Sequence, residues 1–113
     1  MKQMKLSELK VVLEGTGIPF AYHSWPVGKA PALPWGVYLE AYGNSFGADD
    51  VAYSTARHMQ VELYTAKKDP ASEKKIEDAL TAADIYYEKT EETYLETEHC
   101  FETLYELEVL NDG

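Results

Sequence analysis

Basic side chains are scarce in this chain of 113 residues. Ten lysines and arginines stand against twenty aspartates and glutamates, which gives a net charge of −10. Binding to nucleic acid without sequence preference depends on basic side chains that neutralise phosphates, so this balance disfavours it. The same balance argues against docking on an anionic membrane. A chain this acidic is expected to stay soluble and to repel DNA.

Cysteine is also nearly absent. The single cysteine, Cys100, excludes an intrachain disulfide and a thiolate metal cluster, and it favours a reducing compartment. No apolar run approaches the length that spans a membrane, and the first residues lead into an amphipathic helix rather than a signal peptide. We therefore expect a soluble protein made in a cytoplasm, with no membrane partner.

Motifs of catalysis and cofactor binding are missing as well. The sequence has no phosphate-binding loop, no dinucleotide fingerprint and no Gly-x-Ser-x-Gly. Three histidines are spaced unlike the ligands of a zinc site: His23, His58 and His99. Glu98 and Glu102 flank Cys100 on one strand face, and nearby carboxylates raise the pKa of a thiol, which argues against a nucleophile. We expect no enzyme, no cofactor and no metal.

The strongest pattern that is present lies in residues 94–109, where apolar and polar side chains alternate. Period two is typical of a β-strand. At about 3.4 Å per residue the segment would span roughly 54 Å, which is wider than a domain of this size. We therefore expect this strand to bend, to break or to leave the body as an arm. Its acidic face carries five glutamates: Glu96, Glu98, Glu102, Glu106 and Glu108.

Two interpretations of this acidic face stay open. It is either a solvated outer surface of the sheet, or the inner surface of a ring through which DNA passes without sticking. An extended strand cannot wrap these glutamates around one ion, so they offer a weak divalent site at most.

The rest of the chain predicts a single α+β domain over residues 1–113. The expected order is α-β-β-β-α-β-β, a mainly antiparallel sheet with two helices packed on one face. Asp69 is placed to cap the second helix, with Pro70 at its first position. The expected elements are a helix ending at Gly15, strands at 19–25, 35–42 and 51–63, a helix from 70 to 83, and strands at 85–89 and 94–109, with a turn at 90–92.

Two loops are candidates for partner contact: the proline-rich residues 26–34 and the turn-rich residues 43–50. Large rings lie in or beside them, and exposed aromatics next to rigid proline are typical of interface anchors. Packing within the chain is the other explanation. Two lysines before the second helix would complement an acidic patch on a neighbouring copy. The candidate interface is Trp25, Trp35, Phe46, Asp49, Asp50, Lys67 and Lys68.

Several stretches carry a family resemblance. They read WPVGKAPALP at 25–34, VYL at 37–39, VELYTAKKDP at 61–70 and YYEKTEETYLETE at 86–98. Together they resemble a family of small head-tail joining proteins of tailed phages and prophages of Gram-positive bacteria. Proteins of this kind are similar to the tail-terminator, or tail-completion, proteins of long-tailed phages.

This resemblance implies a virion protein of the tail or neck, assembled in the bacterial cytoplasm. It implies a ring, commonly a hexamer, that caps the tail tube, joins it to the head connector protein and leaves a channel for DNA. The expected partners are further copies of this chain, the tail tube protein and the head connector protein. Another joining protein of similar size is a close alternative. An alternative from another class is a monomeric acidic DNA mimic that inhibits a host nucleic-acid-binding protein.

Overall fold

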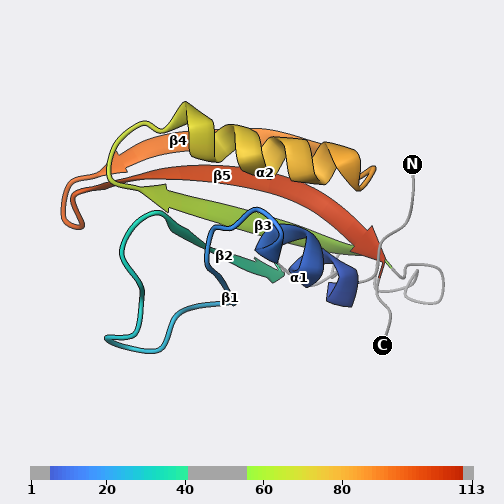
Figure 1. Cartoon of the computed structure of the whole chain (residues 1–113), viewed down its shortest axis with the longest axis horizontal. Coiled ribbons are helices and arrows are strands. Elements are labelled where there is room, and N and C mark those ends of the chain that lie inside the picture. The colour runs from blue at the N-terminus through green and yellow to red at the C-terminus, as the bar shows by residue number, and fades with distance from the viewer. Residues whose placement is uncertain (1–5, 41–55, 111–113) are drawn as a thin grey trace, which may run out of the picture.

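A computed structural model describes residues 6–40 and 56–110 of the chain. In these residues two helices and five strands follow one another in the predicted order, and they form the predicted α+β fold (Figure 1). The elements are α1 (Leu6–Glu14), β1 (Phe20–Tyr22), β2 (Trp35–Glu40), β3 (Ala56–Thr65), α2 (Pro70–Ala82), β4 (Tyr87–Leu95) and β5 (Cys100–Leu110).

The five strands form one sheet in the order β1-β2-β3-β5-β4. All neighbouring pairs are antiparallel except β1 and β2, which run parallel. Adjacent parallel strands need a crossover connection, and residues 23–34 supply it as an ordered loop. We call this segment the crossover loop. The mainly antiparallel sheet confirms the prediction.

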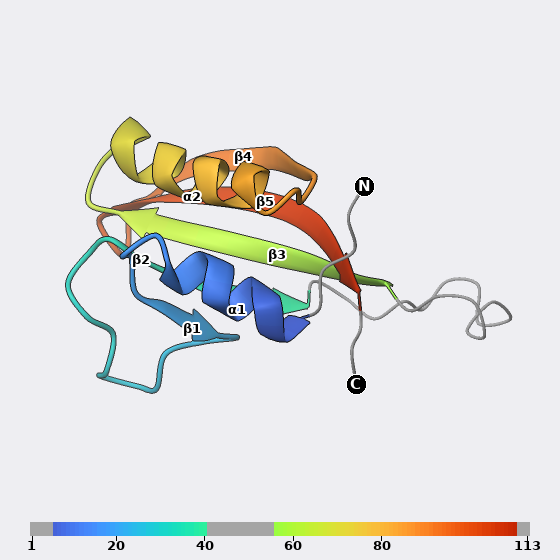
Figure 2. The ribbon, with the colours of Figure 1, turned by 45° about the vertical axis from the view of Figure 1, so that its right-hand side comes forward.

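Both helices lie on the same face of the sheet, as predicted (Figure 2). Each helix contributes apolar side chains at helical spacing to one core, which they share with the inward-facing positions of β3 and β5. The fully buried core residues include Leu9 and Leu13 of α1, Ile76 and Leu80 of α2, and Met59, Val61, Leu63 and Tyr105 of the sheet.

The start of α2 is fixed by its predicted cap. The carboxylate of Asp69 accepts hydrogen bonds from the backbone N–H of Ser72 at 3.1 Å and from its hydroxyl at 2.8 Å. The Ser72 hydroxyl, followed by the backbone N–H, holds the pKa of Asp69 below its usual range. Pro70 stands at the first position of the helix, where its missing N–H costs nothing. The helix therefore begins at the residue that the sequence predicted.

The C-terminal pattern breaks, which is one of the three outcomes that its length predicted. The chain turns at residues 96–99, so the predicted turn at 90–92 is wrong. Glu96 and Glu98 therefore lie in the turn instead of on a strand face. His99, predicted to lie on the apolar face, is exposed and adopts a φ of 54°.

The reason for the misplaced turn is that β4 is an edge strand. Its residues 88–92 are exposed, and the register shifts between Lys89 and Glu91. Charges and bulges are the usual means by which an edge strand avoids pairing with another molecule. The same charges make the sequence of such a strand resemble that of a loop.

Some predicted features lie outside the described residues. These are the last two residues of the predicted strand at 35–42, the loop at 43–50 and the first part of the predicted strand at 51–63, whose described part is within β3. Three candidate interface residues are in this segment: Phe46, Asp49 and Asp50.

Candidate functional site on the open face of the sheet

The face of the sheet opposite the helices carries the candidate site, and we call it the open face. No described helix packs on it. Cross-strand register assigns its residues: Trp35 pairs with Tyr64, and Tyr64 pairs with Glu102. The open face includes Trp35, Val37 and Leu39 of β2, His58, Gln60, Glu62 and Tyr64 of β3, and Glu102, Leu104, Glu106 and Glu108 of β5.

Three of the five glutamates predicted for the acidic face lie there: Glu102, Glu106 and Glu108. Sequence reasoning missed Glu62 as a member of this site. Alternation along β3 predicts its polar side, but nothing in the sequence gives the register that sets β3 beside β5.

An aromatic cluster occupies one end of the open face. The ring of Trp35 stacks on Tyr64, with centroids 4.7 Å apart and planes 32° apart. Trp25, from the crossover loop, meets Trp35 edge-on with centroids 6.2 Å apart. The two predicted interface tryptophans are thus brought together, half-buried. Among the described residues no group accepts a hydrogen bond from the buried Nε1 of Trp25, and a buried donor without an acceptor is costly.

Two hollows flank the stacked pair of Trp35 and Tyr64. The smaller, of about 350 Å³, lies beneath the crossover loop. The larger has a volume of about 470 Å³, and we call it the apolar hollow. It is lined by Leu33, Trp35, Tyr64, Leu95, Glu98 and Cys100.

The apolar hollow joins elements that are distant in sequence. Leu33 comes from the crossover loop, Leu95 ends β4, and Glu98 comes from the turn that the sequence did not predict. Burial raises the pKa of the Cys100 thiol, with smaller contributions from Glu98 and Glu102. A protonated thiol contributes to the hollow as a small apolar group and is a poor nucleophile.

Carboxylates crowd the hydroxyl of Tyr64. This hydroxyl lies 2.8 Å from an oxygen of Glu62 and 2.8 Å from an oxygen of Glu102. Burial, followed by these two hydrogen bonds, raises the pKa of Tyr64 well above its usual range, so the phenol is neutral. A neutral hydroxyl has one hydrogen for two acceptors. It cannot neutralise either charge, and negative charge gathers beside the aromatic cluster.

Further along the open face the carboxylates meet other weak partners. The amide of Gln60 donates to Glu62 at 2.7 Å, and Nε2 of His58 lies 3.1 Å from Glu106. Glu108 follows on β5 and is exposed. None of these contacts, all within the described part of the chain, is made by a lysine or an arginine. The open face is therefore acidic along its length.

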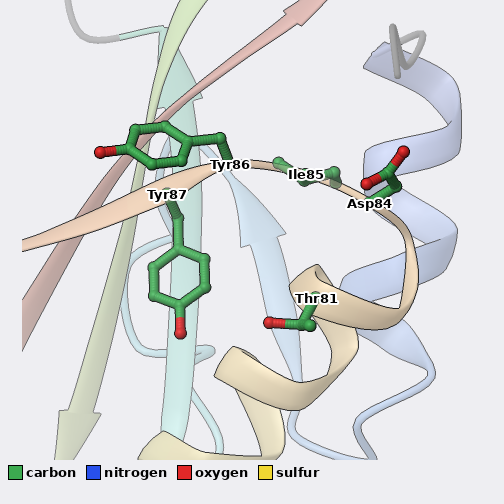
Figure 3. Close-up of a pocket in the computed structure, with 5 residues that line it drawn as sticks. All are labelled: Thr81, Asp84, Ile85, Tyr86 and Tyr87. Atoms are coloured by element: carbon green, nitrogen blue, oxygen red, sulfur yellow. The ribbon is translucent and has the colours of Figure 1, made fainter. Parts of the chain in front are cut away.

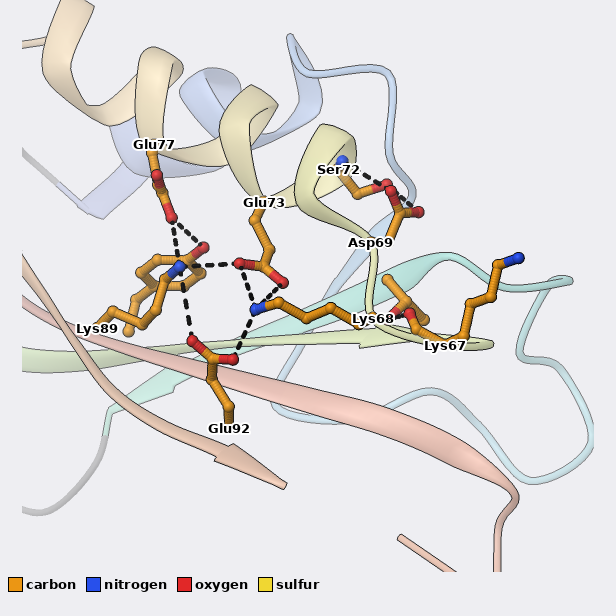
Figure 4. A network of polar contacts seen from close by, with 10 residues as sticks. Lys67, Lys68, Asp69, Ser72, Glu73, Glu77, Lys89 and Glu92 are labelled. Carbon is orange, nitrogen blue, oxygen red and sulfur yellow. Dashed lines mark hydrogen bonds and ion pairs between the residues drawn. The ribbon is translucent and has the colours of Figure 1, made fainter. Parts of the chain in front are cut away.

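On the helix side, by contrast, carboxylates are paired with lysines (Figure 4). Nζ of Lys89 lies 2.8 Å from Glu73 and 3.0 Å from Glu77, and Nζ of Lys68 lies 2.9 Å from Glu73 and 2.6 Å from Glu92. We call these five residues the lysine network. The hydrogen bond to the Glu73 carboxylate holds the pKa of Lys89 above its usual range. The network ties α2 to the edge strand β4.

The two lysines of the candidate interface have different surroundings. Lys68 belongs to the lysine network, whereas the exposed side chain of Lys67 extends away from it (Figure 4). Of the two, Lys67 therefore remains the candidate for contact with a neighbouring molecule.

A further hollow of about 410 Å³ lies where the chain passes from α2 to β4 (Figure 3). Tyr87 packs edge-on against Tyr105 with centroids 5.7 Å apart, while Tyr86 is exposed. The lining residues are Thr81, Asp84, Ile85, Tyr86 and Tyr87. Within this described lining a lone carboxylate and two phenols provide neither a metal site nor a nucleophile with its base.

Two further searches of the described residues concern metals and membranes. No group of three or more histidine, cysteine, aspartate or glutamate side chains is placed to hold a metal ion there. None of the described helices has the length and apolar character needed to cross a membrane.

Comparison with known proteins gives no relative: no family model matches the chain, and neither the curated proteins nor the solved structures searched contain a match.

Proposed function

We propose that this chain is a non-enzymatic phage structural protein that forms a ring at the head-proximal end of the tail tube. The ring terminates the tail and joins it to the head connector protein. The open face is the observation that carries the proposal, because it offers stacked aromatic rings, an apolar hollow and a row of carboxylates that no described helix covers. The resemblance of four stretches to head-tail joining proteins supplies the biological setting.

The sheet edge limits how such a ring closes. The charged, bulged strand β4 disfavours association by strand pairing at that edge. We therefore assign contact between copies to side chains and loops. A closed ring needs a heterologous interface, in which one patch meets a different patch on the next copy. The exposed side chain of Lys67 is suited to meet an acidic patch of that neighbour.

The acidic end of the open face suits the wall of a DNA channel. Glu106 and Glu108 lie there on β5, two residues apart, where a fixed negative charge repels phosphates. DNA then passes without specific binding. The site of action is the virion, at the tail or neck.

The alternative is a monomeric acidic DNA mimic that occupies a basic host protein. The carboxylates of Glu102, Glu106 and Glu108, which share one face of a single strand, favour it. The two functions differ in stoichiometry, because a mimic acts as a monomer and a terminator acts as a ring.

The experiment is molar mass by light scattering over a wide concentration range at two salt concentrations. The same protein is then sedimented with tubes assembled from the tail tube protein of the same phage. We expect a mass near six subunits, or a monomer whose mass rises with concentration, and we expect electron microscopy to show capped tube ends. A strict monomer that also stays in the supernatant with the tubes would contradict the proposal and favour the mimic.

A further inference from the structure

The helix side and the open face both contain aromatic rings and carboxylates, but these groups have different partners on the two sides. In the lysine network, Nζ of Lys68 lies 5.6 Å from the ring centre of Phe101, and Nζ of Lys89 lies 5.9 Å from that of Tyr105. Each cation also meets carboxylates. The apolar hollow likewise sets aromatic rings beside carboxylates, but none of the described residues that line it is a lysine or an arginine.

We propose that the apolar hollow binds an arginine side chain carried by a segment of another protein in the assembly. Arginine has an apolar stem that lies along aliphatic walls such as Leu33 and Leu95. Its planar guanidinium stacks on an aromatic face and pairs with carboxylates through two parallel hydrogen bonds. Trp35 and Tyr64 line the hollow with aromatic rings, and Glu98 lines it with a carboxylate. Lysine has neither the plane nor the paired donors, so it binds less well.

The charges around the hollow also indicate that its occupant carries a positive charge. Glu98 lines the hollow, and Glu62 and Glu102 share the hydroxyl of Tyr64, another residue of the lining. These carboxylates repel DNA and attract a cation. The hollow, at about 470 Å³, lies in the range of sites that bury whole small ligands, so an arginine side chain alone does not fill it. Apolar residues beside the arginine in the partner segment are needed to fill the remaining space.

A different protein is a better source of the arginine than a second copy. This chain has one arginine, Arg57, among its ten basic residues. The inference rests on the proposed function in that the partner belongs to the same assembly. Its test does not need the ring, so failure to assemble and failure to bind arginine are separate results.

The chain's two tryptophans, Trp25 and Trp35, both belong to the aromatic cluster, so tryptophan emission reports on this cluster, and Trp35 lines the apolar hollow itself. The probe is a capped peptide, Gly-Leu-Arg-Leu-Gly. Its controls are the same peptide with lysine, or with uncharged citrulline, in place of arginine. We expect a saturable emission change with the arginine peptide, weaker binding with lysine, and binding about tenfold weaker with citrulline. No emission change at about 1 mM arginine peptide, or equal binding of the citrulline peptide, would overturn the proposal.

Two variants separate this site from general attraction to an acidic protein. Glu98→Gln removes a charge from an exposed turn, which leaves the fold intact, and should weaken binding of the arginine peptide about fivefold. Glu14→Gln removes the same charge from α1 on the helix side and should leave binding unchanged. Equal weakening by both variants would overturn a specific site.

Light scattering on the same samples tests the source of the arginine. We expect the arginine peptide to leave the molar mass unchanged, because the hollow of each copy is then open to another protein. If the peptide dissociates an oligomer, a second copy fills the hollow, which would overturn the assignment to a different protein.

Discussion

Both faces of this sheet carry carboxylates, but the carboxylates have different partners on the two faces. On the helix side, Glu73 is only 5% exposed, and it is held by two lysines that also reach Glu92 of the edge strand. On the open face, Glu62 and Glu102 share one neutral hydroxyl. Both faces belong to one sheet of an acidic chain, so the difference lies in where the few basic residues are placed.

This difference indicates on which face the carboxylates are already paired within the chain. A buried carboxylate must be paired within the chain, since an unpaired buried charge is costly. A half-buried carboxylate keeps part of its hydration and can therefore remain without a cation until a partner molecule binds. The lysine network therefore stabilises the fold, and the open face is the one that our proposal assigns to contact with a partner.

Removing the hub of the lysine network should produce the largest effect. Glu73→Ala leaves Lys68 paired with Glu92 and Lys89 paired with Glu77, and these lysines, which are 44% and 32% exposed, gain hydration in place of Glu73. We expect a loss of about 2 kcal/mol in the free energy of unfolding, below the 3–5 kcal/mol that breaking a fully buried pair costs. Urea denaturation measures this loss.

The matched control is Glu62→Ala on the open face. It removes one of two carboxylates that compete for the Tyr64 hydroxyl, so its effect should stay within about 0.5 kcal/mol. Equal destabilisation by both variants would erase the distinction between the two faces.

The cap of α2 offers an intermediate case, in which hydrogen-bond donors stabilise an anion. Asp69→Ala should cost about 1 kcal/mol at neutral pH. Ser72 lowers the pKa of Asp69 in the folded chain, so the ionised cap stabilises above the ordinary aspartate pKa. That contribution is lost as the pH falls through the lower folded pKa, and the cost of the substitution should shrink accordingly.

Denaturation at several pH values measures the cap, with two matched variants. Asp69→Asn keeps a good cap and should lose less stability, with a weaker pH dependence. Asp78→Ala removes an exposed carboxylate that pairs with Lys74 inside α2, and should change stability by less than about 0.5 kcal/mol. A cost for Asp69→Ala that grows on acidification would contradict the assigned role.

The fold was predictable because local signals agreed with the tertiary structure. The cap at Asp69, the helical stripe through Ile76 and Leu80, and the alternation along β3 each match their place in the fold. The turn at 96–99 was not predictable. It contains no glycine, proline or asparagine, and alternation continues through it. Histidine tolerates the left-handed conformation better than most residues, and His99 adopts it.

The candidate site was predictable only in part. The sequence marks Trp25, Trp35 and Glu102 as candidates, but not that they lie at one end of one face. That arrangement depends on the crossover loop and on the pairing of Tyr64 with Glu102, which are long-range features. Glu98 was predicted on a strand face, and it reaches the apolar hollow because the chain turns there.

The smallest effect should come from giving the open face the cation it lacks. Gln60 pairs across the strands with Glu106 and donates to Glu62, so Gln60→Lys keeps a donor and adds a charge between two carboxylates. We expect a gain of about 0.5 kcal/mol at low salt that fades as salt screens it. Gln60→Met is the matched control, because it keeps the stem without the charge. An equal gain from methionine would assign the effect to apolar packing. A loss with lysine would mean that these carboxylates are already satisfied in the monomer, and the open face would then have no vacancy for a partner's cation.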